Sequence, residues 1–377
     1  MKTAMFLRLL RACRNSATLA LAMLSPAMAY AGPPAALPSQ AQTLYLDEDY
    51  APTERDRASY LLRQPLPRDE ARQAWHAQLY NVQAPGRLHL DVYVKSPEFS
   101  AGEYVHMRKT YYDDGQLAVQ IALDGNGVRD GESLHYHPNG QLAERETFRA
   151  GVAEGAYTTF HENGQLLSVR EFRAGKLADG EYLSYHANGK INSRSRFRGG
   201  QLHGVYEVFY GDGQLYQSGP FADGARHGPL VSYWPDGRLQ SSQAYVRNRL
   251  DGWSLRYHQD GKLARKTLYR ADIMLSEEVW GEDGKPLRRG QWDEQQRAQG
   301  EFREWFPGGE PVSILFYLDG QLHGPLRIWH YTGVLKETAH FVHGKMHGPQ
   351  HIWGKDGSLR AICHWRDGER FGACQTE

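Results

Sequence analysis

A short glycine-punctuated phrase recurs along most of this chain and constrains the fold more than any other feature. One copy, HPNGQL, spans residues 137–142 and contains the turn glycine Gly140. Because the phrase returns every 23 to 25 residues, it predicts stacked units that bury a shared face. The eleven turn glycines are Gly115, Gly140, Gly164, Gly189, Gly213, Gly237, Gly261, Gly284, Gly309, Gly333 and Gly357.

Each phrase has the chemistry of a β-hairpin. Pro138, Asn139 and Gly140 suit a type I turn closed by a left-handed glycine, which makes a three-residue loop. This loop would pair the residues on either side of it, so that Tyr136 faces Leu142. Since side chains alternate along a strand, we expect Tyr136, Leu142 and Phe148 to point the same way.

Two further glycines and an aromatic residue punctuate the units. A second glycine precedes the turn glycine by nine residues, an aromatic residue follows it by eight, and a third glycine follows it by eleven in most units. Asn248 and Asp272 replace the third glycine in two units, and these residue types tolerate a left-handed backbone. The substitution indicates that the position requires a positive φ.

Two irregularities stay open at this point. Many units carry one aromatic residue seven positions before the turn glycine, as at Tyr157, and another four positions before the same glycine. A regular strand cannot direct both side chains to one face, because they are three residues apart. Either a bulge or a sheet buried on both faces would accommodate both residues. The eighth unit replaces the second glycine by Leu275 and the third by Gln295, and this indicates a kink, a functional patch or sequence drift.

The fold class expected from these patterns is all-β, an elongated and twisted antiparallel meander of about eleven tandem hairpins. A single hairpin is marginal in water, and a row of them buries a continuous apolar face. We expect a signal peptide at residues 1–31, an N-terminal lead-in or cap at 32–85 and the repeat array at 86–377.

The first 31 residues have the features of an export signal. A basic start precedes the short apolar stretch Ala17–Met28, and the strings AMA and AYA suit a cleavage site. An uncleaved membrane anchor is the alternative, although the apolar stretch is short for a membrane span. The leader holds four of the 44 basic residues and no acidic residue, so the remaining chain has a net charge of −4. That charge gives no reason to expect nucleic acid as a partner, and the leader predicts a periplasmic location.

Two cysteines, Cys363 and Cys374, flank the last turn of the chain. If Trp365 faces Gly372 across this turn, Cys363 faces Cys374, and an oxidising compartment would favour a disulfide between them. Two free thiols are the alternative.

Histidines recur in two positions of the repeat. They precede the second glycine at His203, His227, His323 and His347, and they follow the strand aromatic at His137, His161, His186, His258 and His330. A metal ladder is conceivable, but histidines of successive units would lie about 10 Å apart, which is too far for shared ligation. We therefore interpret them as structural and predict no metal and no cofactor.

Catalytic motifs are missing from the sequence. It has no G-x-S-x-G, no H-E-x-x-H and no phosphate-binding loop, so we expect no catalytic residues and a protein that is not an enzyme. The tryptophans of the later units, Trp280, Trp305, Trp329 and Trp353, occupy the repeat's aromatic slot. Core packing is the first interpretation, and an exposed row that contacts sugar, lipid or a partner is the second.

The glycine-punctuated hairpin resembles the MORN repeat, over about residues 86–377. Its form, with an aromatic pair, Asn-Gly or Asp-Gly, then Gln/Lys/Arg-Leu and a later F-x-x-G, is similar to the variant in bacterial YwqK-type antitoxin proteins. The segment Tyr45–Arg63 is similar to the lead-in often found before such arrays, and Arg87–Ser96 would supply the first strand. This resemblance implies an antitoxin or immunity role exerted by binding.

Two classes of function follow. The first is a periplasmic protein that binds another protein, most simply as an immunity protein against a toxin or secreted effector that acts in the periplasm. The second is a cell-envelope scaffold that binds lipid or glycan. The sequence leaves the partner-binding residues unknown, because every position that the pattern fixes is fixed by the fold.

Overall fold

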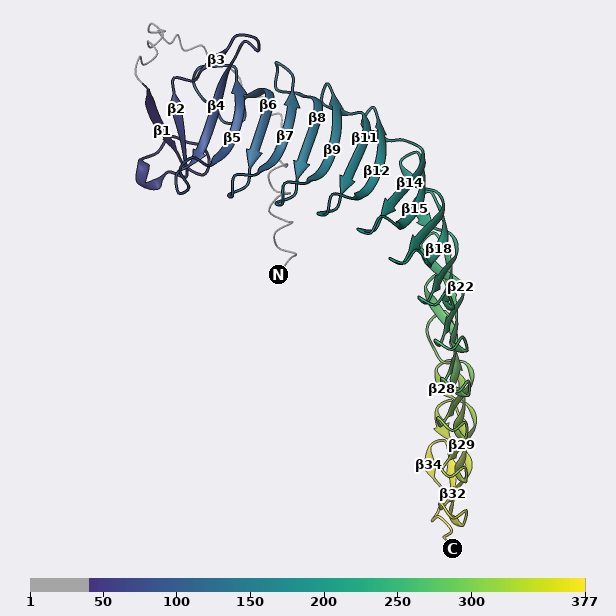
Figure 1. Ribbon diagram of the computed structural model, residues 1–377. Coiled ribbons are helices and arrows are strands. Elements are labelled where there is room, and N and C mark those ends of the chain that lie inside the picture. The colour runs from purple at the N-terminus through teal and green to yellow at the C-terminus, as the bar shows by residue number, and fades with distance from the viewer. Residues whose placement is uncertain (1–40, 377) are drawn as a thin grey trace, which may run out of the picture.

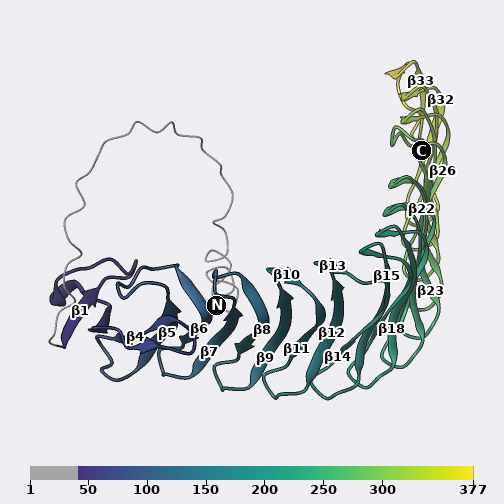
Figure 2. The same ribbon diagram turned by 90° about the horizontal axis from the view of Figure 1, so that it is seen from above.

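The computed structural model describes residues 41–376, and these form one antiparallel sheet of 34 strands. Apart from strands, this part of the chain contains a single 3-10 turn, η2 (Arg55–Arg57), and no helix that is long and apolar enough to span a membrane. Figures 1 and 2 show a long ribbon of strands that changes direction around β15 (Ile191–Arg198) and β18 (Leu215–Ala222). The all-β, elongated meander is confirmed, whereas the predicted signal peptide lies outside the described residues.

The first strands form a compact start to the sheet and hold most of its fully buried apolar side chains. β1 pairs with β2, β2 with β4, and β4 with β5, while the short β3 pairs with β4. Leu46, Leu62, Leu79, Leu90 and Val92 are each at most 1% exposed and pack together there. These strands are β1 (Gln42–Leu46), β2 (Tyr60–Gln64), β3 (Arg68–Asp69), β4 (Ala74–Asn81) and β5 (Leu88–Val94).

The eleven hairpins then follow in chain order, each made of one strand before and one strand after its turn glycine. The first strands are β6 (Tyr104–Tyr111), β8 (Arg129–Tyr136), β11 (Gly155–Phe160), β14 (Gly180–Tyr185), β17 (Gly204–Phe209), β20 (Gly228–Tyr233), β22 (Arg249–Tyr257), β24 (Ile273–Trp280), β26 (Gly300–Trp305), β29 (Gly324–Trp329) and β32 (Gly348–Trp353). The second strands are β7 (Leu117–Leu123), β9 (Leu142–Arg149), β12 (Leu166–Arg173), β15, β18, β21 (Leu239–Val246), β23 (Leu263–Arg270), β25 (Pro286–Gln291), β27 (Pro311–Leu318), β30 (Leu335–Val342) and β33 (Leu359–Arg366). Two-residue strands extend the far ends of several hairpins, namely β10 (Val152–Ala153), β13 (Lys176–Leu177), β16 (Gln201–Leu202), β19 (Ala225–Arg226), β28 (Gln321–Leu322), β31 (Lys345–Met346) and β34 (Glu369–Arg370).

The hairpin loop has the predicted geometry, but a bulge beside it changes which side chains share a face. Tyr136 pairs with Leu142, and Gly140 has a φ of +83°, as expected. The register then shifts, so that His135 pairs with Glu144 and Ala143 is left without a partner. Because the extra residue reverses the alternation, Tyr136 and Leu142 lie on the face opposite Phe148. The prediction that all three share a face was therefore wrong.

The same bulge resolves the parity problem of the aromatic residues. Tyr157, seven positions before its turn glycine, lies on the same face as Phe172, eight positions after it, and their rings meet edge to face at 6.4 Å. The second glycine of each of nine units pairs with the aromatic residue of the second strand, as Gly155 does with Phe172. A glycine opposite an aromatic ring leaves the space that the ring fills.

The third glycine marks a two-residue turn at the opposite end of the hairpin. Asn248 and Asp272 have φ values of +69° and +70°, so the predicted left-handed backbone is confirmed at both replacements. The preceding residues also have positive φ, at +49° for Arg247 and +50° for Ala271. Two successive positive φ values are typical of a type I′ turn, whose twist matches that of the flanking strands.

Side chains near the turn glycines tie each unit to the next. The Nε2 atom of His137 lies 3.0 Å from the carbonyl oxygen of Phe160, and His186 reaches the carbonyl oxygen of Phe209 at 2.9 Å. Where the histidine is replaced by Tyr210, the hydroxyl group donates to the carbonyl oxygen of Tyr233 at 2.8 Å. These bonds satisfy backbone acceptors at the hairpin ends and set the spacing of neighbouring units.

A disulfide between Cys363 and Cys374 closes the last unit, with the two Cα atoms 4.3 Å apart. Ile362 pairs with Gln375 beside it, in the register expected for these cysteines. Trp365, however, pairs with Arg370 rather than with Gly372, because a two-residue turn closes this hairpin. The terminal segment thus lies along the last long strand, β33.

Candidate binding surface

The repeat array has a more buried and a more exposed face, and we call the more buried one the inner face. Among the described residues that follow Gly115, every buried side chain lies on it, for example Tyr182, Leu230 and Leu326. On the outer face, Val205 and Trp253 are 54% and 43% exposed.

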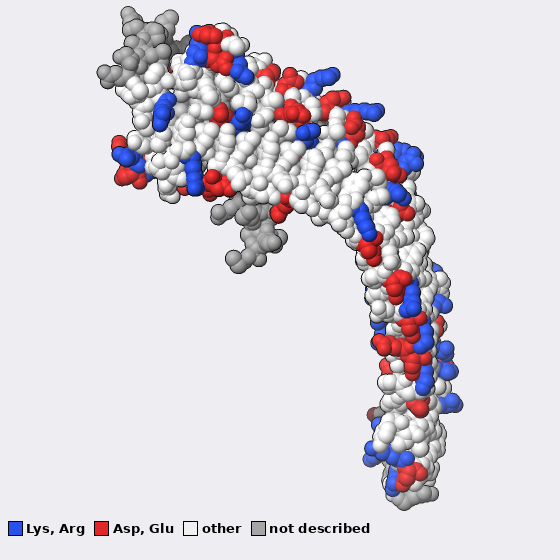
Figure 3. Space-filling model, viewed as in Figure 1, with Lys and Arg blue, Asp and Glu red and all other residues white. Residues whose placement is uncertain are grey.

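The inner face of units three to eight carries an excess of positive charge. Pairing and alternation place five arginines but only one glutamate among its strand residues. They are Arg170, Arg226, Arg256, Arg265, Arg288 and Glu277. The chain as a whole holds 44 basic and 44 acidic residues, so this excess is local. On the side shown in Figure 3, both charge signs alternate along the later strands.

Two depressions open on this face. One, of 430 Å³, spans units five to seven and is lined by Tyr216, Ser232, Trp234, Gln240, Ser241, Gln243, Arg256, Tyr257 and Ala264. The other, of 300 Å³, spans units three to five, and its lining includes four serines, Tyr182, Tyr206 and Arg170. Aromatic rings beside hydroxyl and guanidinium groups, with two side-chain amides in the first depression, make both suited to polar ligands with acceptor groups.

A larger depression of 480 Å³ at the turn edge is less suited to binding. It is lined by His137, His161, Asn163 and their neighbours. The Nε2 atom of His161 already lies 2.8 Å from the carbonyl oxygen of Tyr185, and the Asn163 amide donates to Ala187. Its polar groups are therefore used to join units.

The eighth unit places a buried ion cluster where most other units have an aromatic residue, leucine or serine. Glu277 is 6% exposed and lies 3.2 Å from Arg265 and 2.6 Å from Arg288. Leu230 and Leu326 occupy the same repeat position in two other units. Both guanidinium groups remain about half exposed, so only the carboxylate depends fully on the cluster for solvation.

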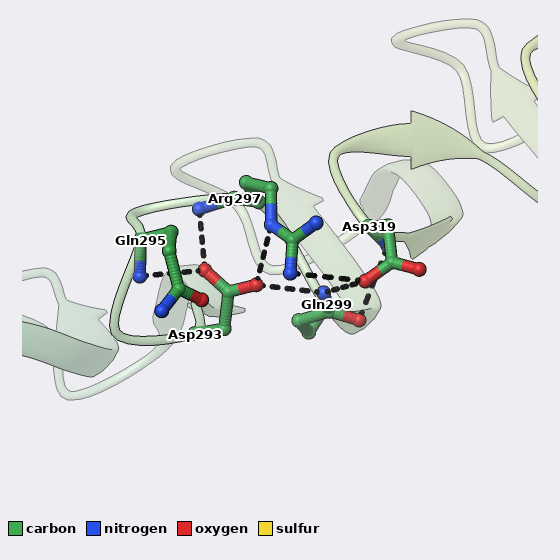
Figure 4. Close-up of polar contacts among 5 residues, drawn as sticks. All are labelled: Asp293, Gln295, Arg297, Gln299 and Asp319. Atoms are coloured by element: carbon green, nitrogen blue, oxygen red, sulfur yellow. Dashed lines mark hydrogen bonds and ion pairs between the residues drawn. The ribbon is translucent and has the colours of Figure 1, made fainter.

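The second turn of the eighth unit is one residue longer than that of its neighbours. The residue with positive φ is Gln296, at +62°, rather than Gln295 as the alignment suggested. The Asp293 carboxylate accepts hydrogen bonds from the Gln295 and Arg297 N–H groups and from the Arg297 and Gln299 side chains (Figure 4). Burial alone would raise the pKa of Asp293, but these hydrogen bonds outweigh it and hold that pKa below its ordinary value.

This network also connects two units. Gln299 and Arg297 both reach Asp319 in the following turn, at 3.2 and 3.3 Å (Figure 4). The hydrogen bonds of Asp293 and Asp319 thus hold the longer turn of the eighth unit in place. The bend of the ribbon lies earlier, around β15 and β18. The interpretation of the eighth unit as a kink finds no support in this position.

The histidines before the second glycine lie at the other edge of the sheet. His203 and His347 lie 3.9 and 3.5 Å from Asp223 and Asp367, and the rings of His323 and His343 are 5.0 Å apart. Residues 41–376 contain no group of three or more His, Cys, Asp or Glu side chains that could hold a metal ion.

Two polar clusters in the first strands were not found from the sequence. His76 Nε2 lies 2.6 Å from Asp91 Oδ1, and its ring stacks on Tyr93. The Tyr50 hydroxyl group lies 2.9 Å from His89 Nε2, and burial raises the pKa of Tyr50 to about 12 and lowers that of His89. Within the described chain, no hydroxyl or thiol group hydrogen-bonds to the His76 ring.

The tryptophan row lies on the outer face and is half-buried at all four positions, so neither sequence interpretation describes it fully. The ring of Trp353 stacks on His351, with centroids 5.6 Å apart. The inner-face arginines were also missed. The alternation of side chains along each strand would have placed these arginines on one face only if the position of the bulge had been known.

The comparisons with known proteins agree with this repeat geometry. Residues 129–150, 153–174, 178–198 and 202–223 match the model of the MORN repeat variant. These four units are similar to the MORN repeat variant. The other units share the turn glycines and strand registers of these four. MORN repeats in general bind proteins or membranes.

Matches to whole proteins add little. No curated protein matches the sequence. The crystal structure of TcdB2-TccC3-TEV is similar over 82% of this chain and 23% of that chain, at 11% identity and a TM-score of 0.17. The structure of the Photorhabdus luminescens Tc holotoxin pore is similar over 86% and 22%, at 12% identity and a TM-score of 0.17. This chain thus spans less than a quarter of either, and TM-scores this low relate neither fold nor function.

Proposed function

We propose that this protein is a non-enzymatic, periplasmic MORN-repeat protein that binds another protein and neutralises it. In this role it is an immunity protein against a toxin or secreted effector that acts in the periplasm. The inner face carries the proposal, because it offers accessible polar and aromatic groups over many consecutive units. An extended repeat surface of this kind suits a large partner.

The periplasmic location in this proposal rests on the first 31 residues of the sequence. A binding protein against a cytoplasmic toxin has no use for export, whereas the basic and apolar residues at the start of the chain suit secretion. The two cysteines fit the same compartment, since disulfides persist in oxidising environments.

A challenge experiment tests this role. Sensitive cells would express the full chain, or the chain without residues 1–31, and be exposed to an effector encoded beside its gene. We expect protection only by the exported form, together with a stoichiometric complex in the periplasm. Absence of protection and of a complex would contradict the immunity role.

The second candidate is an envelope scaffold that binds lipid or glycan. It is favoured by the half-buried tryptophans of the outer face, because aromatic side chains with one wet edge suit membrane interfaces and sugar rings. Co-sedimentation with liposomes or peptidoglycan, without any protein partner, would select this function over the first.

A further inference from the structure

The depression across units five to seven is lined by a tryptophan whose buried N–H group has no acceptor in the described part of the chain. The Trp234 indole Nε1 is shielded from solvent and has no hydrogen-bond partner within residues 41–376. An unpaired buried N–H group costs stability, whereas neighbouring polar groups such as Gln217 and Ser232 bond to each other, at 3.0 Å. A ligand that brings an acceptor to Trp234 would remove this cost.

An unpaired guanidinium group lines the same depression. Arg256 is exposed and forms no ion pair or hydrogen bond with any described residue, unlike Arg265 and Arg288, which both pair with Glu277. The lining contains no carboxylate. Its one formal charge is therefore positive and is available to a ligand.

The other groups of the lining are consistent with an acidic ligand. Gln240 and Ser241 add donors, and Tyr216 presents a ring that is 37% exposed. Arg170 repeats the arrangement in the second depression, where it is also exposed and without an ion pair in the described chain. Two cationic sites on one face, several units apart, suit a chain-like ligand that carries more than one carboxylate.

We propose that the inner face of units three to seven binds an acidic loop or tail of the protein partner, with Arg256 and the Trp234 indole receiving a carboxylate side chain. The inference rests on the proposed protein-binding function. Arg256 supplies a charge-assisted hydrogen bond, Trp234 fixes the acceptor, and Arg170 holds a second carboxylate. A protein segment is favoured over a membrane surface because Arg256 and Trp234 line a depression, which a side chain can enter and a flat bilayer reaches poorly.

The repeat itself offers variants that preserve the fold. Trp234→Phe removes the indole N–H and leaves a smaller aromatic ring in its place, and Phe306 occupies the same repeat position in the ninth unit. Arg256→Ser introduces the residue found at Ser232. Arg247→Ala is the control that removes the same charge elsewhere. Arg247 lies in a turn, six residues along the chain from Ser241, and Ser241 is the cross-strand partner of Arg256. Alanine suits this turn, because Ala271 occupies the equivalent position in the next unit.

The test measures binding of a fluorescent peptide that alternates glutamate and serine, with a glutamine–serine peptide as the uncharged control. We expect the acidic peptide to bind the wild-type chain and the control peptide to bind much more weakly. Arg256→Ser and Trp234→Phe should each weaken binding, by about tenfold for the arginine, while Arg247→Ala leaves it close to wild type.

Several results would overturn the inference. They are no binding of the acidic peptide at millimolar concentration, equal losses for Arg256→Ser and Arg247→Ala, or Arg256-dependent binding of phosphatidylglycerol vesicles or hyaluronan fragments without binding of the peptide. A partner captured equally by wild type and Arg256→Ser would keep the proposed function and reject this surface. Absence of any protein partner would reject the function itself.

Discussion

His161 places its Nε2 atom 2.8 Å from the carbonyl oxygen of Tyr185, which belongs to the next repeat along the chain. The same bond recurs wherever a histidine follows the strand aromatic, from His137 to His330. A residue that looks like a metal ligand in the sequence therefore serves as a connection between hairpins. In a sheet one layer thick, such connections supply part of the stability that a globular core provides elsewhere.

Replacing this histidine should weaken the junction between two units. We expect His161→Ala to lower the free energy of unfolding by about 1 kcal/mol, because the Tyr185 carbonyl group loses its partner. Urea denaturation measures the change. His347→Ala is the control, since His347 is half-exposed and lies at the other edge of the sheet. Equal losses for both variants would contradict a specific role for the inter-repeat bond.

Gly290 should be intolerant of a side chain even though its backbone is unstrained. A Cβ atom there would overlap the ring of Phe302, which is already held between Trp292 and Tyr317. We expect Gly290→Ala to destabilise the protein by about 1–3 kcal/mol, the usual cost of overpacking. Gly211→Ala, which meets no atom within 4 Å, should have little effect on the melting temperature. A tolerated Gly290→Ala would show that the Phe302 ring moves freely.

The buried ion cluster of the eighth unit should respond asymmetrically to mutation. Glu277→Leu introduces the residue of the equivalent positions Leu230 and Leu326 and leaves two arginines that can turn to water, so we expect a small change in stability. The double variant Arg265→Gln, Arg288→Gln leaves a buried carboxylate unpaired and should cost about 1–3 kcal/mol or more. Chemical denaturation of both variants checks this order, and the reverse order would contradict it.

The hairpins were predictable because the determinants of a turn are local. Pro138-Asn139-Gly140 specifies its loop, and Asn248 and Asp272 revealed a backbone requirement that their φ values satisfy. The face on which each side chain lies was not predictable, because the loop residues do not reveal the bulge at Ala143, and this bulge inverts the alternation. That single shift moved Tyr136 to the outer face and hid the inner-face arginines, so the candidate surface could be defined only from the structure.

The Asp293 network predicts a dependence of stability on pH. The pKa of Asp293 is lowered in the folded chain, so the carboxylate contributes stability above its unfolded pKa, about 3.9, and this contribution is lost as the pH falls through the folded value. We therefore expect Asp293→Asn to be less stable than wild type at neutral pH, with a difference that shrinks below about pH 4. Asp223→Asn, an exposed turn residue, serves as the control in urea denaturation at several pH values. A pH-independent difference would reject this role of Asp293.

The terminal disulfide should keep the last edge of the sheet covered. Cys363–Cys374 holds the terminal segment against β33, where Ile362 N–H and C=O groups bond to Gln375, and an uncovered edge strand invites pairing with another chain. We expect the double variant Cys363→Ser, Cys374→Ser to lose roughly 3 kcal/mol of stability and to self-associate at high concentration. Size-exclusion chromatography with light scattering measures the association, and the double substitution avoids cross-linking by a lone thiol. If the variant loses stability but remains monomeric, the disulfide acts only by restricting the unfolded chain. That result would contradict a role in preventing association through the edge of the sheet.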